Sequence, residues 1–375
     1  MTTTEARLDR IRGPAAPRNH NARTIAALSS NPGCARRAVM DAAGVDKQRV
    51  AAHTGFPAPF GQSRFALTRG NAFEAQVKAD GCAELLRLLR EHLHLTIPEA
   101  SYDDLNEVGG NTSQSLRHTQ TRRLLARSAA EGRDAGTMFD HPLLRMQVGG
   151  RPVYLEPDLL AFQLHGRFHV VEIKSFSVID GQADGDKVAA AAVQSAVYVL
   201  ALREVLAELG TGQEAVADQV LLVCPENFSN RPTAAVLDVR KQLTVLRRQL
   251  SRLAGIDSLL EPLPPGLTFD LAPDASGAPQ RPAGELADAL ATVPARYIPE
   301  CLATCEMCFF CRNEAAGATA ALGRTALDDL GGIEHIATVL ALARGTTQPP
   351  AEQAEAAELL RSAARLRREC LGEAV

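Results

Sequence analysis

The sequence VVEIKSF, residues 170–176, places two charged residues inside an otherwise apolar run. The apolar residues in it are β-branched or aromatic, which predicts a β-strand. Side chains alternate between the two faces of a strand, so Glu172 and Lys174 are expected on one face and Ile173 on the other. A carboxylate and an ammonium in a buried strand cost free energy unless they are paired or bind something. An ion pair on an exposed sheet face and a site that binds an ion both fit this pattern.

Two turns connect this strand to the strands before it. Gly149-Gly150 separates predicted strands over 143–148 and 151–164, and such a dipeptide is typical of a hairpin. A second short turn, at His165-Gly166, leads into the strand of Glu172. The alternation of elements predicts an α/β fold in which a mixed sheet is flanked by helices. The other predicted elements are helices over 31–45, 66–93, 113–132, 188–210 and 239–255, strands over 219–225 and 234–239, and irregular connections over 46–64 and 256–292.

Length and charge limit the class of protein. The chain has 375 residues, which is enough for one large domain or two. Its net charge is −4, so contacts with nucleic acid must come from local basic patches. No apolar run approaches the length of a membrane span, and residues 1–22 have no apolar segment like that of a secretory signal. We therefore expect a cytoplasmic protein without a membrane span, and a flexible arm over 1–22.

An acidic residue in the preceding strand extends the charged site. Asp158 follows Pro157, and in a hairpin the carboxylates of Asp158 and Glu172 can converge on one cation. Hard oxygen ligands favour Mg²⁺ or Mn²⁺, and the backbone carbonyl of Ile173 would be a further ligand. Such a cation polarises a phosphoryl oxygen and lowers the pKa of a bound water. Lys174 would orient that water or help to deprotonate it.

Two predicted helices carry polar residues that fit the same site. Glu74 lies four residues after Gly70 and could add a carboxylate to the metal, although most helical glutamates are solvated. Gln194 and Tyr198 are four residues apart, so they project from one face of their helix. This polar pair could be satisfied within the core, or it could line the cleft and touch DNA or Lys174.

The order of these motifs resembles the PD-(D/E)xK nuclease superfamily, in particular its RecB-like branch. In that branch a helix carries a Gly-x-x-x-His or Glu motif, the core strands carry an Asp and a Glu-x-Lys, and the next helix carries Gln-x-x-x-Tyr. The resemblance implies a restriction-endonuclease-like core, a metal held by the three acidic residues, a catalytic Lys174, and substrate contacts from Gln194 and Tyr198. The matching residues are Gly70, Glu74, Asp158, Glu172, Lys174, Gln194 and Tyr198.

The resemblance also implies a domain organisation. It covers about residues 31–312, and a RecB-like nuclease domain is therefore expected over 23–312. The stretch between Glu74 and Asp158 is long, which predicts a helical insertion at about 77–140. Residues 313–375 would form a C-terminal helical tail, whose helices could dock a partner protein.

Cysteines are concentrated near the end of this predicted domain. Cys301, Cys305, Cys308 and Cys311 fall within eleven residues. Disulfides are not expected in a cytoplasmic chain, and structural zinc sites usually pair two short cysteine knuckles across a longer loop. Closely spaced cysteines together with one remote cysteine are a common arrangement for an iron–sulfur cluster. Cys34 is the remote candidate, and zinc remains the alternative.

The resemblance extends to CRISPR-associated RecB-like exonucleases and AddB-type nuclease domains. In these families one cysteine precedes the nuclease motifs and three follow them, and together they hold a [4Fe–4S] cluster. Here four cysteines follow, with a different spacing. The cluster would pin the N-terminal helix to the C-terminal segment, so that its binding free energy becomes folding free energy. The expected ligands are Cys34, Cys305, Cys308 and Cys311, with Cys301 as the substitute.

Basic residues form two groups in predicted helices. They would neutralise DNA phosphates, or they would be the solvated faces of amphipathic helices. The first group is Arg122, Arg123 and Arg127, and the second is Arg240, Lys241, Arg247, Arg248 and Arg252.

By this resemblance we expect a Mg²⁺- or Mn²⁺-dependent deoxyribonuclease. It would act as an exonuclease on single-stranded DNA or DNA ends, in repair, recombination or phage defence, including CRISPR adaptation. The alternative is a non-catalytic iron–sulfur subunit that binds DNA or a protein partner within a helicase–nuclease or defence complex.

Overall fold

The chain divides into two compact units. A computed structural model describes residues 3–58, 64–93, 100–131, 136–149, 151–164, 166–227 and 229–372. The sheet unit consists of Arg18–Ser29 and Gly61–Ser258, and the cysteine unit consists of Met1–Pro17, Ser30–Phe60 and Leu259–Val375. The domain predicted over 23–312 therefore includes parts of both units, because segments far apart in the sequence pack together in the cysteine unit.

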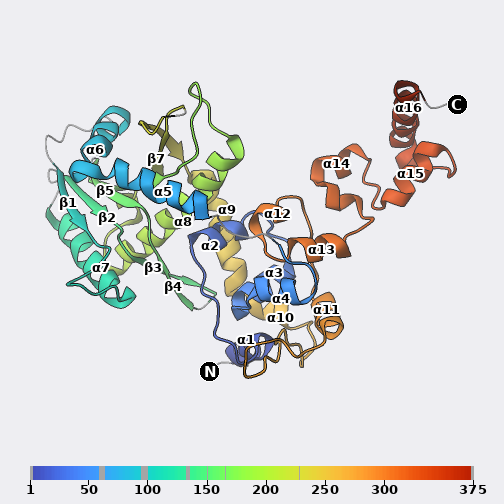
Figure 1. Ribbon diagram of the computed structural model, residues 1–375, viewed down its shortest axis with the longest axis horizontal. Coiled ribbons are helices and arrows are strands. Elements are labelled where there is room, and N and C mark those ends of the chain that lie inside the picture. Colours follow the sequence, from blue (N-terminus) through green and yellow to red (C-terminus); the bar gives the residue numbers. More distant parts are fainter. Residues whose placement is uncertain are drawn as a thin grey trace. The chain divides into compact units, whose positions relative to one another are not determined.

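A mixed sheet forms the centre of the sheet unit. Its described strands are β1 (Ala100–Asp104), β2 (Gly136–Asp140), β5 (Leu159–Leu164), β6 (Arg167–Ile173), β7 (Gln219–Pro225) and β8 (Pro232–Asp238). They form one six-stranded sheet in the order β1-β2-β5-β6-β7-β8 (Figure 1). The β1–β2 and β6–β7 pairs are parallel, and the other pairs are antiparallel. The predicted α/β class with a mixed sheet is confirmed.

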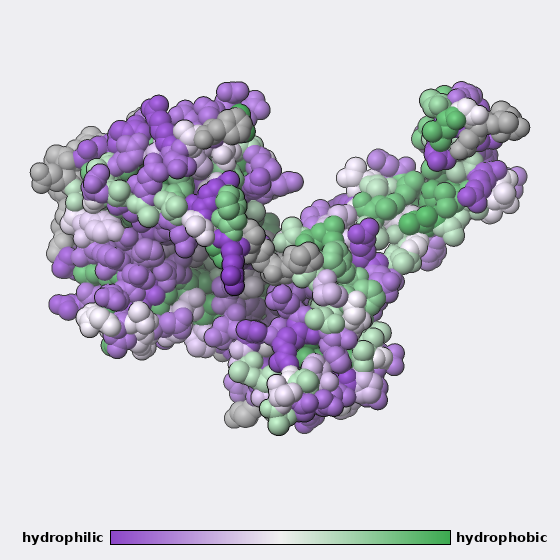
Figure 2. Space-filling model, in the orientation of Figure 1, coloured by the Kyte–Doolittle hydropathy of each residue, from purple (hydrophilic) through white to green (hydrophobic). Residues whose placement is uncertain are grey.

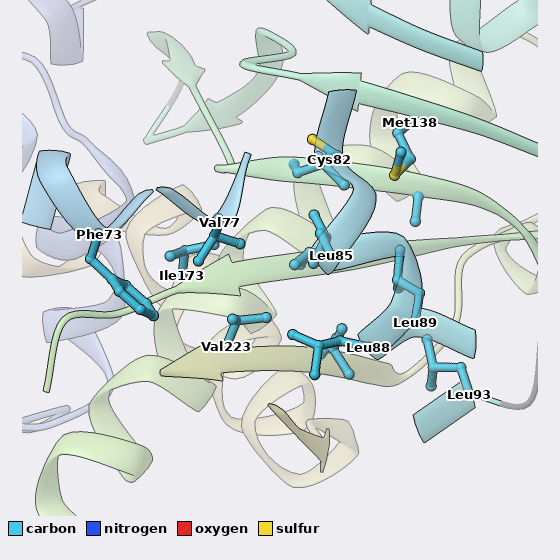
Figure 3. Close-up of a cluster of buried hydrophobic side chains, with 14 residues drawn as sticks. Phe73, Val77, Cys82, Leu85, Leu88, Leu89, Leu93, Met138, Ile173 and Val223 are labelled. Carbon is cyan, nitrogen blue, oxygen red and sulfur yellow. The ribbon is translucent and has the colours of Figure 1, made fainter. Parts of the chain in front are cut away.

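Helices cover both faces of this sheet. Those described in the sheet unit are α2 (Ala22–Leu28), α5 (Arg64–Val77), α6 (Ala79–Leu93), α7 (Gln114–Glu131), α8 (Gly185–Glu208) and α9 (Arg240–Ala254). Val171 and Ile173 of β6 belong to an apolar cluster with residues of α5 and α6 (Figure 3). Glu172 lies on the opposite face, where its neighbour Leu222 in β7 packs with Ala191 of α8. The alternation predicted for this strand therefore directs Glu172 toward α8.

The helix α8 is the core helix of the sheet unit. It packs against β6, α2 and α9, as well as β3 (Leu144–Val148). By length and composition it could cross a membrane, but 67% of its most apolar 18-residue window is buried. Its apolar composition is therefore explained by packing inside the sheet unit.

The strand predicted over 151–164 is divided between two sheets. β4 (Arg151–Leu155) pairs with β3 in a separate hairpin, as the Gly149-Gly150 signal predicted, whereas β5 pairs with β2 and β6. Pro157 lies between β4 and β5, and a proline cannot donate a hydrogen bond within a sheet. The chain changes sheets at this point, which leaves Asp158 immediately before β5.

The region predicted as a helical insertion, at about 77–140, is not entirely helical. Besides α6 and α7 it contains β1 and β2, which extend the main sheet. Their sequences, ASYDD and GTMFD, show no regular alternation of apolar and polar residues. Pairing with neighbouring strands, rather than local pattern, makes these segments strands.

The cysteine unit is helical, and its first helix replaces the predicted flexible arm. In α1 (Thr3–Arg12), Leu8 and Ile11 are buried, and the carbonyl of Ile11 accepts a hydrogen bond from the Phe269 amide at 2.7 Å. The connections predicted over 46–64 and 256–292 also contain helices. The further helices are α3 (Ala35–Ala43), α4 (Lys47–His53), α11 (Ala283–Ala291), α12 (Cys301–Thr304) and α13 (Cys308–Glu314), and α10 (Ile256–Leu260) spans the boundary in sequence between the units.

The C-terminal segment is helical, as predicted. It contains α14 (Arg324–Asp329), α15 (Ile336–Arg344) and α16 (Ala354–Leu371), and a small apolar cluster holds α15 against α16. Figure 2 shows apolar side chains on the surface of this segment. The exposed leucines there are Leu322, Leu340, Leu359, Leu366 and Leu371.

A buried histidine on α7 links the stability of the sheet unit to pH. His118 Nδ1 lies 2.9 Å from the carbonyl oxygen of Leu143, and Nε2 has no hydrogen-bond partner among the described residues. Burial lowers the pKa of His118. The unfolded chain therefore binds a proton at a pH where the folded chain does not. This contribution to stability is present above the unfolded pKa of about 6.5 and is lost as pH falls below it.

We expect the free energy of unfolding to decrease as pH falls from about 7.5 to about 5.5, and His118→Leu to make that decrease measurably smaller. Urea unfolding can be followed by tyrosine fluorescence, because Tyr102, Tyr154 and Tyr198 all lie in the sheet unit. An equal decrease in the wild type and the variant would show that His118 is not responsible.

Candidate active site

The carboxyl end of β6 and the start of β5 bring three predicted site residues together. The two strands are antiparallel neighbours, with Leu159 opposite Val171, so Asp158 lies beside the end of β6. Asp158 Oδ2 accepts a hydrogen bond from the Ile173 amide at 2.7 Å. Lys174 follows directly, and its own amide donates to Val223 O at 2.9 Å. The hairpin therefore holds Asp158, Glu172 and Lys174 on one rigid edge.

Glu172 is fully buried, and only one of its carboxylate oxygens is paired. Lys174 Nζ forms an ion pair with Oε1, whereas Oε2 has no hydrogen-bond partner among the described residues. Burial raises the pKa of Glu172 to about 8, with a further contribution from the negative charge of Asp158, while Lys174 opposes both. Burial also raises the pKa of Asp158. A buried carboxylate and a half-buried one thus share one lysine, and this arrangement favours an additional cation.

The Gln194–Tyr198 pair on α8 faces this edge of the sheet. Gln194 Nε2 lies 3.2 Å from the hydroxyl oxygen of Tyr198, and Tyr198 is buried. Burial raises the pKa of Tyr198 well above its usual value, and the negative charges of Glu172 and Asp158 raise it further. The structure therefore places Tyr198 near both carboxylates, and the two side chains lie on one helix face, as their spacing predicted, where they share a hydrogen bond.

Glu74 lies near the same carboxylates, but it already has partners of its own. Its Oε1 is 2.5 Å from Lys78 Nζ and 3.4 Å from His141 Nε2. Burial opposes ionisation, but the hydrogen bond with His141 and the charge of Lys78 lower the pKa of Glu74. The negative charge of Glu74 in turn raises the pKa values of Asp158 and Glu172.

Residues that the sequence analysis missed surround Glu74. Asp140 ends β2, and His141 follows with a φ of 48°. Within the described residues, one group of three metal-ligating side chains has all donor atoms within 4.8 Å of one another, and it consists of Glu74, Asp140 and His141. Asp158 and Glu172 are not in so compact a group. The sequence feature that could have indicated these residues is the Asp140-His141 pair at the end of a strand. It can be recognised only when β2 is known to be a strand.

Charges within this second group are balanced by two cations. Lys78 Nζ lies 2.5 Å from Asp140 Oδ1, His141 Nδ1 lies 3.0 Å from the same oxygen, and the hydroxyl of Tyr102 donates to Oδ2. Burial alone would raise the pKa of Asp140, but these contacts outweigh it and lower the pKa to about 2. Hydrogen bonds to Asp140 and Glu74 raise the pKa of His141 to about 10.

The cysteine unit gathers the predicted cluster ligands. Cys301, Cys305, Cys308 and Cys311 are buried, and Cys34, which precedes α3, is partly buried. Burial raises the pKa of Cys311 to about 12, and the thiols of Cys305 and Cys34 contribute. Burial also raises the pKa of Cys308, with a contribution from Cys301. Folding of the chain therefore brings Cys34 close to Cys311, which a metal site shared by Cys34 and residues 301–311 would require.

Cationic and amide groups lie beside these sulfur atoms. Arg36 Nη1 is 3.4 Å from Cys311 Sγ, and Asn31 Nδ2 is 3.2 Å from Cys301 Sγ. Burial raises the pKa of Cys305 to about 11, against the positive charges of Lys47 and Arg37. Such groups would compensate the charge of ligating thiolates.

Some of the basic residues predicted to contact DNA have acidic or polar partners. Arg122 lies 3.6 Å from Glu208, Arg240 pairs with Asp238, and Arg247 contacts Gln213 at 3.4 Å. Their side chains are half-buried or exposed, which is compatible with contact to phosphates and with a solvated helix face.

Comparison with known proteins adds little to this geometry. Neither a protein-family model nor a curated protein matches the sequence. A crystal structure of a "Putative exonuclease" from Eubacterium rectale matches with a TM-score of 0.27 and 12% identity, and covers 56% of this chain and 79% of its own. The crystal structure of SSO0001 matches with a TM-score of 0.17 and 14% identity, and covers 45% and 84%, respectively. Similarity at this level carries no argument about function, which must come from the site.

Proposed function

We propose that the sheet unit is a divalent-metal-dependent deoxyribonuclease of the PD-(D/E)xK type, with a RecB-like, restriction-endonuclease-like core. The observation that carries this proposal is the buried carboxylate of Glu172, which has one unpartnered oxygen beside Asp158 and Lys174. With a pKa of about 8, Glu172 holds a proton near neutral pH unless a cation takes its place, and oxygen ligands favour Mg²⁺ or Mn²⁺. Asp158 and Glu172 would hold the ion, and the Ile173 carbonyl and Glu74 are further candidate ligands.

The residues around the ion have separate roles in phosphodiester hydrolysis. When bound, the cation supplies a Lewis acid that stabilises negative charge on the phosphoryl oxygens. Burial disfavours the charged form of Lys174, but the negative charges of Glu172 and Asp158 raise its pKa, so the side chain remains an ammonium. Lys174 is therefore suited to donate hydrogen bonds to the attacking water or to a phosphate oxygen rather than to remove a proton. Gln194 and Tyr198 would support the substrate strand from α8.

The cysteine unit would hold a [4Fe–4S] cluster through Cys34, Cys305, Cys308 and Cys311, with Cys301 as the substitute. When bound, the cluster supplies a covalent link between two segments some 270 residues apart, and its role would be structural. Arg36, Arg37 and Lys47 would offset the negative charge of the ligating sulfurs.

A cleavage assay with end-labelled single- and double-stranded DNA and Mn²⁺ tests the nuclease. Glu172→Gln preserves the size of the side chain but removes its charge, and we expect cleavage to fall at least about 100-fold. Glu204→Gln is the control, because Glu204 is an exposed glutamate of α8 that accepts a hydrogen bond from the Gln147 amide at 3.3 Å, away from the site. Equal cleavage by the wild type and Glu172→Gln would refute the proposal.

A non-catalytic subunit is the second candidate. The exposed leucines on α14–α16 and the segment before them favour it, because such apolar side chains are available to a protein partner. A stable complex with DNA or protein and no cleavage with Mg²⁺ or Mn²⁺ would support this candidate. In either case we propose a cytoplasmic protein that acts in repair, recombination or phage defence.

A further inference from the structure

A lysine lies at the centre of the compact group formed by Glu74, Asp140 and His141. Lys78 Nζ is 2.5 Å from Glu74 Oε1, 2.5 Å from Asp140 Oδ1 and 2.9 Å from the carbonyl oxygen of Asp158. Glu74 and the Asp158 carbonyl accept hydrogen bonds from this ammonium, and Asp140 forms an ion pair with it. The side chain is only 8% exposed. The position between these oxygens is therefore filled by a cation that belongs to the chain.

The orientation of His141 agrees with this. Nδ1 lies 3.0 Å from Asp140, and Nε2 lies 3.4 Å from Glu74. A carboxylate oxygen therefore lies beside each ring nitrogen, and Nε2 is also 3.5 Å from Lys78 Nζ. The donor set that would suit a divalent ion is thus already engaged by contacts among its own members and with Lys78.

The backbone explains how Lys78 reaches this position. It lies at the junction of α5 and α6, and Ala79 separates it from Asp80, Gly81 and Cys82, whose φ values are 52°, 65° and 63°. This left-handed stretch begins two residues after Lys78 and interrupts the helix. The lysine is therefore presented at a break in the helix, opposite the ends of β2 and β5.

Lys78 also connects this group to the proposed metal site. It binds the carbonyl of Asp158, whose carboxylate is held by the Ile173 amide. It also neutralises Glu74, whose charge acts on both Asp158 and Glu172. We infer that Lys78 is a built-in cation that takes the place of a second divalent ion, so that the site binds one Mg²⁺ or Mn²⁺, with Lys78 positioning Asp158 and Glu74. This inference rests on the proposed function for the single ion.

Counting bound Mn²⁺ by equilibrium dialysis tests the inference. Lys78→Met removes the ammonium but keeps the length of the side chain, and we expect the variant to bind one more Mn²⁺ per chain than the wild type. Lys78→Arg, which keeps a cation, should bind no additional ion. In Lys78→Met/His141→Phe the additional ion should be lost, because one of its ligands is gone. Mn²⁺ should also raise the melting temperature of Lys78→Met more than that of the wild type.

Two results would overturn the inference. One is a wild-type protein that already binds a second ion which His141→Phe removes. The other is a folded Lys78→Met variant with no additional ion. If Lys78→Met folds only when Mn²⁺ is present, the ion replaces the ammonium and the inference is supported; if it fails to fold even then while Lys78→Arg folds, the inference is refuted.

The same measurement separates this inference from the proposed function. The first ion should be lost in Asp158→Asn, and if it is not, the proposed site is wrong. The effect of Lys78→Met is the difference in bound Mn²⁺ between a protein with this substitution and the same protein without it. It can therefore also be measured by comparing Asp158→Asn with Lys78→Met/Asp158→Asn. Each idea can therefore fail without the other.

Discussion

Lys174→Ala is expected to lower the rate of DNA cleavage about 100- to 1,000-fold at saturating Mn²⁺. The side chain is 28% exposed and paired with Glu172, so it can reach a substrate while its charge is held in place. Its removal would take away the ammonium that faces the reacting phosphate. Metal binding should not weaken, because Lys174 competes with the ion for Glu172; we expect Mn²⁺ affinity to stay equal or to rise. Loss of rate with retained affinity would identify a role in catalysis.

Lys187→Ala is the matched control for this experiment. Lys187 lies in the first turn of α8, is 58% exposed and pairs with Asp184 at 3.3 Å. Its loss removes one lysine from the same unit without touching the site, so cleavage should be unchanged. If Lys174→Ala cleaves DNA as fast as the wild type, the activity comes from a contaminant and the non-catalytic candidate is favoured.

Cys308→Ser is expected to abolish the cluster and to destabilise the cysteine unit by more than about 4 kcal/mol. Cys308 is 2% exposed and lies at the start of α13. Its replacement by serine would remove one thiolate ligand of the cluster from the interior of the unit. Iron content and visible absorbance of the purified protein measure the cluster, and chemical unfolding measures the stability. About four iron atoms per chain are expected in the wild type.

The other cysteines provide the controls and settle the ligand set. Cys370 is exposed on α16, so Cys370→Ser should keep the iron, the colour and the stability. Comparing Cys34→Ala with Cys301→Ala decides between the predicted ligand and its substitute, because only loss of a ligand removes the cluster. A wild-type protein that contains zinc and no iron, or a stable brown Cys308→Ser variant, would contradict the proposed cluster.

Local patterns were sufficient to predict which residues lie together at the centre of the candidate site. The alternation in VVEIKSF places Glu172 and Lys174 on one face, the turn before it pairs β5 with β6, and the four-residue spacing on α8 joins Gln194 to Tyr198. These features depend on residues that are neighbours along a strand, a helix or a hairpin. Their geometry follows from backbone periods of two and 3.6 residues, which do not require knowledge of the rest of the fold.

Long-range packing decided the remainder. β1 and β2 have no regular alternation, and without them Asp140 and His141 could not be assigned to the site. Lys78 reaches Asp140 and Asp158 because a helix breaks beside two strand ends, and Cys34 meets the cysteine segment because distant parts of the chain pack in one unit. Such contacts depend on burial and charge compensation between segments far apart in the chain, which no local period encodes.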